Sequence, residues 1–163
     1  MTSQARSEAR FLALIEEYAG MLARIAAPYA QTPEDKADLI QEIRLQLWRA
    51  LPSLDADRNA RTWAYRVALN TAISWYRRAR TWRPVEHEME SIADGEEIST
   101  EALVLRQLIA GLDPVNRALL TLHLEGLSNE EVGQVMGLTP QNVATKLTRL
   151  RQQLRSLINR PTL

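Results

Sequence analysis

The sequence predicts an all-α protein made of two small helical domains joined by an acidic linker, the second domain containing a helix-turn-helix. Apolar residues recur at three- and four-residue steps along most of the chain, and no convincing β-strand pattern interrupts them. Residues that start and stop helices separate these periodic stretches. A chain of 163 residues that is 45% hydrophobic can bury one moderate core or two small ones, and a polar stretch in its middle favours two.

The N-terminal half is expected to contain three helices. Apolar spacing predicts the first over about Ser7–Pro28, where the proline interrupts it. Thr32, followed by Pro33, starts a second helix, which Pro52 ends. After a polar connection, a long third helix is expected over about Ala60–Arg80.

Two further helices are expected before the helix-turn-helix. The first begins at Ser99 or Thr100 and is closed by Gly111. Pro114, behind a capping aspartate, starts the next, and Gly126 closes it.

The segment 127–155 predicts two short helices joined by a tight turn, which is a helix-turn-helix. Ser128 and Glu131 form a capping box at the start of the first helix, and Gly137 can adopt the left-handed conformation that ends it. Thr139 caps the second helix. The apolar residues that this spacing would bury are Val132, Val135, Leu138, Val143, Leu147, Leu150 and Leu154.

The second helix of this pair leaves polar and basic side chains on its exposed face. A recognition helix enters the major groove through its N-terminal residues, so amides and hydroxyls there, with cations one turn later, indicate mixed base and phosphate contacts. The alternative is a helical hairpin with a solvated basic face, but two consecutive caps around a short turn favour DNA contact. The residues expected at DNA are Pro140, Gln141, Asn142, Thr145, Lys146 and Arg149.

One face of the expected third helix combines an aromatic ring, an amide, a hydroxyl and two arginines. Trp63, Arg66, Asn70, Ser74 and Arg77 follow one another at three- and four-residue steps. Taken alone, Trp63 is better interpreted as a packed core residue. The strip as a whole indicates stacking on unpaired bases, with phosphate contacts beside them.

Charge is sorted along a chain whose net charge is zero, with 20 basic and 20 acidic residues. Arg61–Arg83 and the stretch from Pro140 to the end contain basic residues and no acidic ones, whereas Pro84–Glu101 contains seven acidic residues and no Lys or Arg. This distribution indicates two nucleic-acid faces separated by an acidic tether. A merely solvated linker is the alternative interpretation of the acidic stretch.

Several classes of function are disfavoured. The absence of cysteine excludes disulfides, a cysteine-based zinc site and a thiol nucleophile. Glu86, His87, Glu88 and Glu90 could supply metal ligands, but no rigid shell is expected around them, and His123 has no evident partner acid or nucleophile near it in the sequence. We expect no catalytic residue, metal or cofactor. The chain lacks a membrane-length apolar run and a secretory signal, so we expect a soluble, cytoplasmic protein with no membrane insertion.

These segments, in this order, resemble the sigma-70 family of bacterial RNA polymerase initiation factors, in the short extracytoplasmic-function type that keeps only domains 2 and 4. Asp38–Leu51 is similar to region 2.2, Ala60–Arg80 to regions 2.3 and 2.4, and Leu112–Arg155 to region 4. The resemblance covers nearly the whole chain. It implies a transcription initiation factor that binds polymerase core and reads the minus 10 and minus 35 elements of promoters.

The resemblance also implies domains, partners and roles for residues. Domain 2 would span 1–83, the linker 84–99 and domain 4 100–163. Implied partners are the clamp of the largest polymerase subunit, the flap of the second largest, promoter DNA and an anti-sigma factor. The loop from Leu54 to Arg61 would form the pocket for a flipped base. Core contact is implied for Asp38, Leu39, Gln41 and Glu42, and minus 10 contact for Asp55, Arg58, Asn59, Arg61, Trp63, Arg66, Asn70, Ser74, Arg77 and Arg78.

Two departures from the family pattern and one rival affect these expectations. Arg66 and Val67 stand where housekeeping members carry a tryptophan pair, which implies weaker melting and stricter promoter choice. Ala144 removes one cation expected in the recognition helix. The rival is a conventional helix-turn-helix regulator, which would bind duplex DNA without core polymerase.

Overall fold

The computed structural model describes residues 2–55, 59–82 and 99–159. Within these ranges the regular structure is entirely helical, as the sequence predicts. The chain divides into two compact units, Met1–Glu97 and Ile98–Leu163, here called the N-terminal and C-terminal units. Among the described residues, every helix is too short or too polar to span a bilayer. The acidic stretch expected between the units lies largely outside the described residues.

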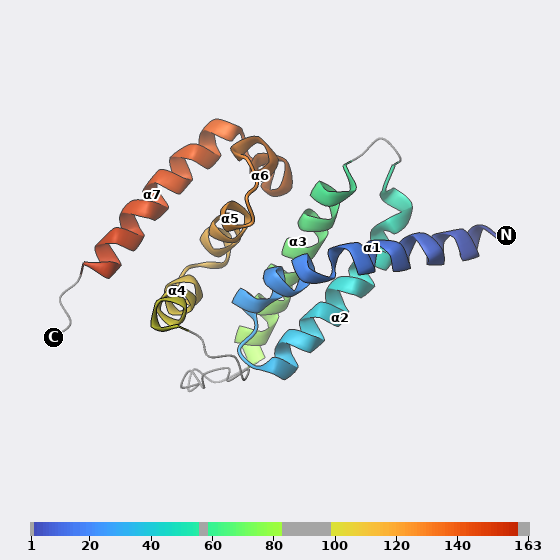
Figure 1. The fold of residues 1–163 in the computed structure, drawn as a ribbon, viewed down its shortest axis with the longest axis horizontal. Coiled ribbons are helices and arrows are strands. Elements are labelled where there is room, and N and C mark those ends of the chain that lie inside the picture. The colour runs from blue at the N-terminus through green and yellow to red at the C-terminus, as the bar shows by residue number, and fades with distance from the viewer. Residues whose placement is uncertain (1, 56–58, 83–98, 160–163) are drawn as a thin grey trace. The chain divides into compact units, whose positions relative to one another are not determined.

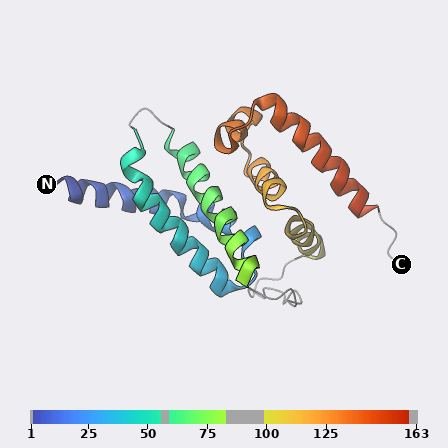
Figure 2. The ribbon, with the colours of Figure 1, turned by 180° about the vertical axis from the view of Figure 1, so that it is seen from behind.

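Three long helices and two short 3-10 turns form the N-terminal unit. In Figures 1 and 2, α2 and α3 run side by side, α1 lies across them, and the first turns of α1 extend past the pair. Because these first turns have no neighbour, most of their side chains are exposed. The elements are α1 (Ser3–Ala26), η1 (Ala27–Tyr29), α2 (Pro33–Ala50), η2 (Leu51–Ser53) and α3 (Ala60–Trp82).

Local capping explains where these helices begin. α1 begins earlier than the sequence predicted, because the Thr2 side chain accepts a hydrogen bond from the Ala5 amide at 3.2 Å. Thr32 caps α2 in the same way, at 3.0 Å from the Asp35 amide, and Pro33 occupies the first helical position. The predicted start of α2 is therefore confirmed.

The core of the N-terminal unit lies where the three helices meet. Rings contribute beside the aliphatic residues: Phe11 and Trp48 pack edge to face with centroids 5.2 Å apart, and Tyr29 and Tyr76 do so at 6.0 Å. The first pair joins α1 to α2, and the second joins η1 to α3. The fully covered residues include Leu22, Ile25, Ala26, Leu39, Ile43, Ala64, Ala68 and Ala72.

Four helices form the C-terminal unit, and Figure 1 shows α6 as the short connection at one end between α5 and the long α7, with α4 at the other end of α5. Every predicted start is present, with Ser99, Asp113, Ser128 and Thr139 as the caps. Val132, Val143, Leu147 and Leu150, predicted for this core, are buried. The helices are α4 (Thr100–Ala110), α5 (Pro114–Leu124), α6 (Asn129–Met136) and α7 (Pro140–Ile158).

Candidate nucleic-acid interface

The turn between α6 and α7 is set by short-range geometry. Ser128 accepts a hydrogen bond from the Glu131 amide at 3.1 Å, and the Glu131 carboxylate accepts one from the Ser128 amide at 3.0 Å, which completes the predicted capping box. Gly137 ends α6 with φ of 72°, in the left-handed region that favours glycine. Thr139 then caps α7 by accepting from the Asn142 amide at 3.1 Å. Two caps this close force α7 to start in a new direction.

Gly133 is a part of this turn that the sequence pattern did not single out. It is buried in α6, and its carbonyl oxygen accepts a hydrogen bond from the Leu138 amide at 2.9 Å. A β-carbon at Gly133 would overlap the carbonyl oxygen of Leu138. A small residue at this place in the first helix is the only signal that the sequence could have offered.

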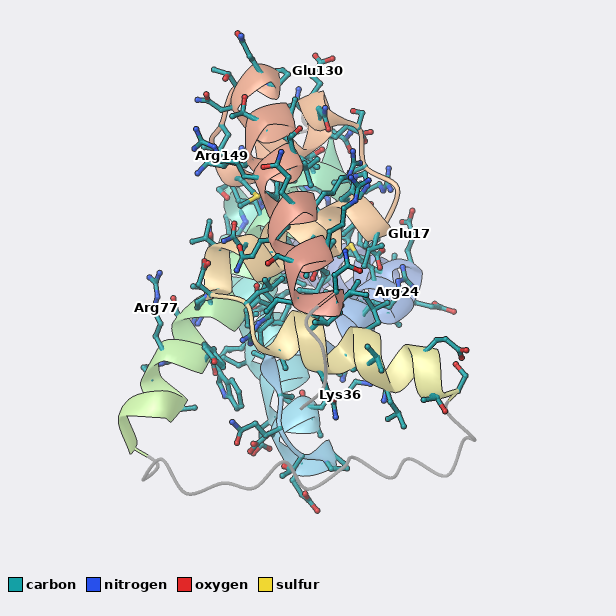
Figure 3. The ribbon with its side chains drawn as sticks, turned by 90° about the vertical axis from the view of Figure 1, so that its left-hand side faces the viewer. Glu17, Arg24, Lys36, Arg77, Glu130 and Arg149 are labelled. Atoms are coloured by element: carbon teal, nitrogen blue, oxygen red, sulfur yellow. The ribbon has the colours of Figure 1, made fainter. Side chains whose placement is uncertain are left out.

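The exposed face of α7 carries the side chains expected at DNA. The six residues predicted there all lie on the exposed side, whereas Val143, Leu147 and Leu150 are buried on the other. Figure 3 shows Arg149 extending away from α7 and Glu130 pointing outward at the start of α6. The exposed six are Pro140, Gln141, Asn142, Thr145, Lys146 and Arg149.

Hydrogen bonding within α7 determines which donors and acceptors Thr145 and Gln141 can offer to DNA. The Thr145 hydroxyl donates to the Gln141 carbonyl oxygen at 3.0 Å. Its hydrogen is therefore used inside the helix, and its oxygen remains available to accept from a donor such as a base amino group. The amide of Gln141 has no such internal use, so it keeps both donor and acceptor for a base edge.

A polar strip follows one face of α3. Arg66, Asn70, Ser74 and Arg77 are exposed at successive turns, and Figure 3 shows the Arg77 side chain extending away from the α3 ribbon. Arg78 is exposed beside the strip. This surface offers cations, an amide and a hydroxyl along the helix, which suits a nucleic-acid backbone.

Trp63 does not belong to the exposed strip. Its side chain is only 8% exposed, so the packed-core interpretation of this residue holds and stacking on a base is not open to it in this conformation. Trp63 lies in the first turn of α3. Leu51 and Leu54, at the other side of the connection before α3, are also buried.

The connection before α3 contains several residues expected at the minus 10 element. Asp55 and Asn59 are exposed, and Arg58 lies outside the described residues. Asn59 caps α3, because its side-chain oxygen accepts from the Arg61 amide at 3.0 Å. Arg61 is exposed, and its guanidinium lies 5.5 Å from the ring centroid of the buried Tyr65.

Helix α1 flanks this connection, which the sequence pattern did not reveal. The Arg10 guanidinium donates to the Leu54 carbonyl oxygen at 3.5 Å, a long contact. Burial raises the pKa of Tyr18, the Glu17 carboxylate raises it further, and the positive charge of Arg61 opposes both. Helix α1 thus brings the Arg10 cation to the connection before α3 and places Tyr18 near Arg61 of α3.

One face of α2 carries the residues expected to contact polymerase. Asp38 and Gln41 are exposed, and Glu42 is half-buried and accepts a hydrogen bond from the Gln46 side chain at 3.2 Å. Leu39, also expected at this contact, is fully buried at 0% exposure, so it can hold the helix in place but cannot touch a partner. Leu45 was not expected there, yet it is 41% exposed on the same face as Asp38 and Glu42.

The residues considered for metal or acid-base chemistry have no place in the described site. Glu86, His87, Glu88 and Glu90 lie outside the described residues, and no group of three potential metal ligands occurs within them. His123 Nε2 lies 3.4 Å from an Arg151 guanidinium nitrogen, between α5 and α7. That contact bridges two helices of the C-terminal unit.

Comparison with known families and proteins follows the same two units. Residues 14–82 match the sigma-70 region 2 family, and residues 102–154 match the sigma-70 region 4 family. The first match contains α2 and α3, and the second contains α5, α6 and most of α7. Each unit thus corresponds to a separate family match.

Several relatives align over most of their length. The chain is 26% identical to RNA polymerase sigma factor NccH of Alcaligenes xylosoxydans xylosoxydans, covering 89% of this chain and 84% of that protein. It is 27% identical to the ECF RNA polymerase sigma-E factor of Escherichia coli, covering 88% and 84%. Among solved structures, RpoE of Bartonella quintana, in complex with the anti-sigma factor NepR, aligns with a TM-score of 0.75 at 18% identity, over 93% of this chain and 99% of that one. CnrH, in complex with the cytosolic domain of CnrY, aligns with a TM-score of 0.70 at 24% identity, over 95% and 94%.

Proposed function

This chain belongs to the sigma-70 family as a sigma factor of the extracytoplasmic-function type, a factor that directs RNA polymerase to promoters, and from that premise we propose how its two units divide the work. Domain 2 spans 1–83, binds polymerase, and recognises and melts the minus 10 element. Domain 4 spans 100–163 and reads the minus 35 element, and 84–99 links them. The observation that carries this proposal is the presence of two separate polar and basic helix faces, on α3 and on α7.

The minus 35 element is read as duplex by α7. Gln141 and Asn142, in the first turn, reach base edges in the major groove, where an amide can bond bidentately to adenine. Thr145 accepts from a base amino group, because its hydrogen is used within the helix. Lys146 and Arg149 hold phosphates or a guanine edge one turn further on. Since Ala144 has no polar side chain, it contributes no such contact.

The minus 10 element is held as single strand along α3. Arg66 and Arg77 neutralise phosphates at the two ends of the strip, and Asn70 and Ser74 supply hydrogen bonds between them. The connection before α3 closes over one flipped base, with Asp55 and Arg61 at its two ends. Asn59 acts mainly as the cap that fixes where α3 begins.

The exposed face of α2 docks on the clamp of the largest polymerase subunit. Asp38, Gln41 and Glu42 provide charge and hydrogen bonds at this contact. Leu45 adds an apolar side chain one turn further along the same face. Protein interfaces bury such apolar side chains at their centre, within a polar rim. Leu39 contributes only by packing inside the unit. Domain 4 would contact the flap of the second largest subunit.

An anti-sigma factor is a further proposed partner. Two structurally similar proteins support this: RpoE was solved with the anti-sigma factor NepR bound, and CnrH was solved with the cytosolic domain of CnrY bound. Pull-down of the full chain from its native host, followed by inhibition of transcription with the captured protein, tests this.

The central experiment compares promoter binding with and without polymerase. Purified chain and core enzyme are incubated with a genomic template library, and the selected promoters are identified by transcription and footprinting. The proposal expects weak duplex binding by the chain alone and specific initiation only with core. Tight, specific duplex binding without core, unaffected by its addition, would instead favour a conventional helix-turn-helix regulator.

A further inference from the structure

We propose that Arg117 is a positioning residue which fixes the angle between α4 and the helix-turn-helix, and that this rigid joint limits the promoter spacer lengths that the factor accepts. The inference rests on the proposed function, because it assumes that α7 reads the minus 35 element. Arg117 lies in the second turn of α5.

The guanidinium of Arg117 completes the C-terminal end of α4. The side chain is 2% exposed, and Nη2 donates to the Ala110 carbonyl oxygen at 2.8 Å and to the Leu112 carbonyl oxygen at 2.9 Å. Ala110 is the last residue of α4, and the last carbonyls of a helix have no donor within it. A buried cation at this end also meets the negative pole of the helix dipole. Arg117 therefore ties α4 and the following turn to α5.

Packing alone attaches α4 weakly. None of its residues is buried, and Ala102, Leu108 and Ile109 are only half-covered. By contrast, α5 buries a continuous set of residues, among them Leu119 and Leu122 at 0% exposure. Because few apolar contacts define the orientation of α4, the charged hydrogen bonds from Arg117, one to the last residue of α4 and one to Leu112 in the turn after it, contribute strongly to holding the helix.

The position of α4 in the chain links this joint to the choice of promoter spacer length. It is the first helix of the C-terminal unit, so the chain that comes from the N-terminal unit enters through it. When the two units are bound to their promoter elements, the DNA between those elements sets the distance that the connection must span. A stiff connection favours one distance between the two promoter elements. A loose connection permits several distances, but the effective concentration of the C-terminal unit at the minus 35 element is then lower at each of them.

Hydrogen exchange on the full chain tests the joint directly. We expect Arg117→Met to speed exchange of the α4 amides by about 10- to 100-fold, the range for loss of charged hydrogen bonds, while α6 and α7 keep their protection. Arg117→Lys keeps the charge but not the planar guanidinium, so its α4 amides should exchange at a rate between those of the wild type and Arg117→Met. Arg106→Met is the matched control, because Arg106 is exposed on α4 itself. Unchanged α4 protection in Arg117→Met overturns the inference, and so does loss of protection throughout 99–159, which would make Arg117 a general core residue.

Transcription with core enzyme then measures the effect on spacer choice. The templates carry one promoter whose spacer is lengthened or shortened by one and two base pairs. Arg117→Met should lower peak activity and reduce the preference for the best spacer over its neighbours by about twofold or more. An equal loss at all spacer lengths overturns the inference, since a merely destabilised unit would behave so. If the wild-type factor needs no minus 35 element, the proposed function fails, whereas the exchange result on α4 still stands by itself.

Discussion

Gly133 and Leu138 approach so closely across the turn of the helix-turn-helix that a methyl group on Gly133 would overlap the Leu138 carbonyl oxygen. The carbonyl is part of the backbone and is held by the turn, so it cannot move away without changing the direction of α7. The angle between α6 and α7 therefore depends on a glycine that is buried inside α6.

Gly133→Ala should destabilise the C-terminal unit by about 1 to 3 kcal/mol, the usual cost of overpacking a buried site. Thermal and denaturant unfolding of the full chain measure this. Gly20→Ala is the matched control, because the atom facing Gly20 is the end of the flexible Arg24 side chain. In α1 the same change should be neutral or slightly stabilising. Equal stability of Gly133→Ala and the wild type would show that the turn is not as tight as described.

Lys146 and Arg149 should contribute salt-dependent affinity at the minus 35 element. For each phosphate contact that alanine removes, the slope of log affinity against log salt should fall by roughly 0.9. Holoenzyme binding to promoter DNA, measured over a salt series, gives these slopes. Arg155→Ala is the control, since Arg155 is exposed near the opposite end of α7 from the reading residues. Unaltered affinity and slope in the double alanine variant would contradict the assignment.

Asp38 and Glu42 should contribute to polymerase docking through charge. The double reversal Asp38→Lys, Glu42→Lys should weaken core affinity, because like charges then meet at the interface, while helical content stays normal. Fluorescence anisotropy with core enzyme measures the affinity. The control reverses Glu8 and Glu16, two exposed acids on α1. Wild-type core affinity in the α2 variant would place the docking surface elsewhere.

Trp63→Ala should act on stability rather than on base stacking. Because the side chain is 8% exposed, its removal should cost about 3 to 5 kcal/mol of unfolding free energy. A melting curve and transcription from a premelted bubble, run on the same variant, separate the two roles. Rescue on the bubble template with little loss of stability would return Trp63 to the DNA-binding strip.

Arg66, Asn70 and Arg77 should affect the open complex without affecting the fold. Surface substitutions of this kind usually change stability by no more than about 0.5 kcal/mol. Alanine at all three should reduce permanganate reactivity of the melted minus 10 element, and the difference from the wild type should shrink as salt is raised. Arg6→Ala controls for a general loss of positive charge, since Arg6 is exposed in the first turns of α1. Normal melting in the triple variant would remove this face of α3 from the site.

Helix ends and the helix-turn-helix could be predicted because the interactions that set them are local. Ser128 and Glu131 bond to each other's backbone within one turn, and Thr139 and Gly137 act on their immediate neighbours. The separation of basic and acidic stretches along the chain can also be read directly from the sequence. These local patterns predicted the all-α fold, the starts of α2 to α7 and the exposed face of α7.

Tertiary structure alone decided which side chains of each stripe are covered. Trp63 lies at helical spacing with the exposed strip of α3, yet its side chain is buried in the N-terminal unit, and Leu39 is enclosed by the three-helix core. No sequence pattern singles out Arg117, but its side chain is 2% exposed and donates to the carbonyl oxygens of Ala110 and Leu112. Periodicity reports the direction in which a side chain leaves its helix. Burial depends on what arrives from distant parts of the chain, which only the packed structure determines.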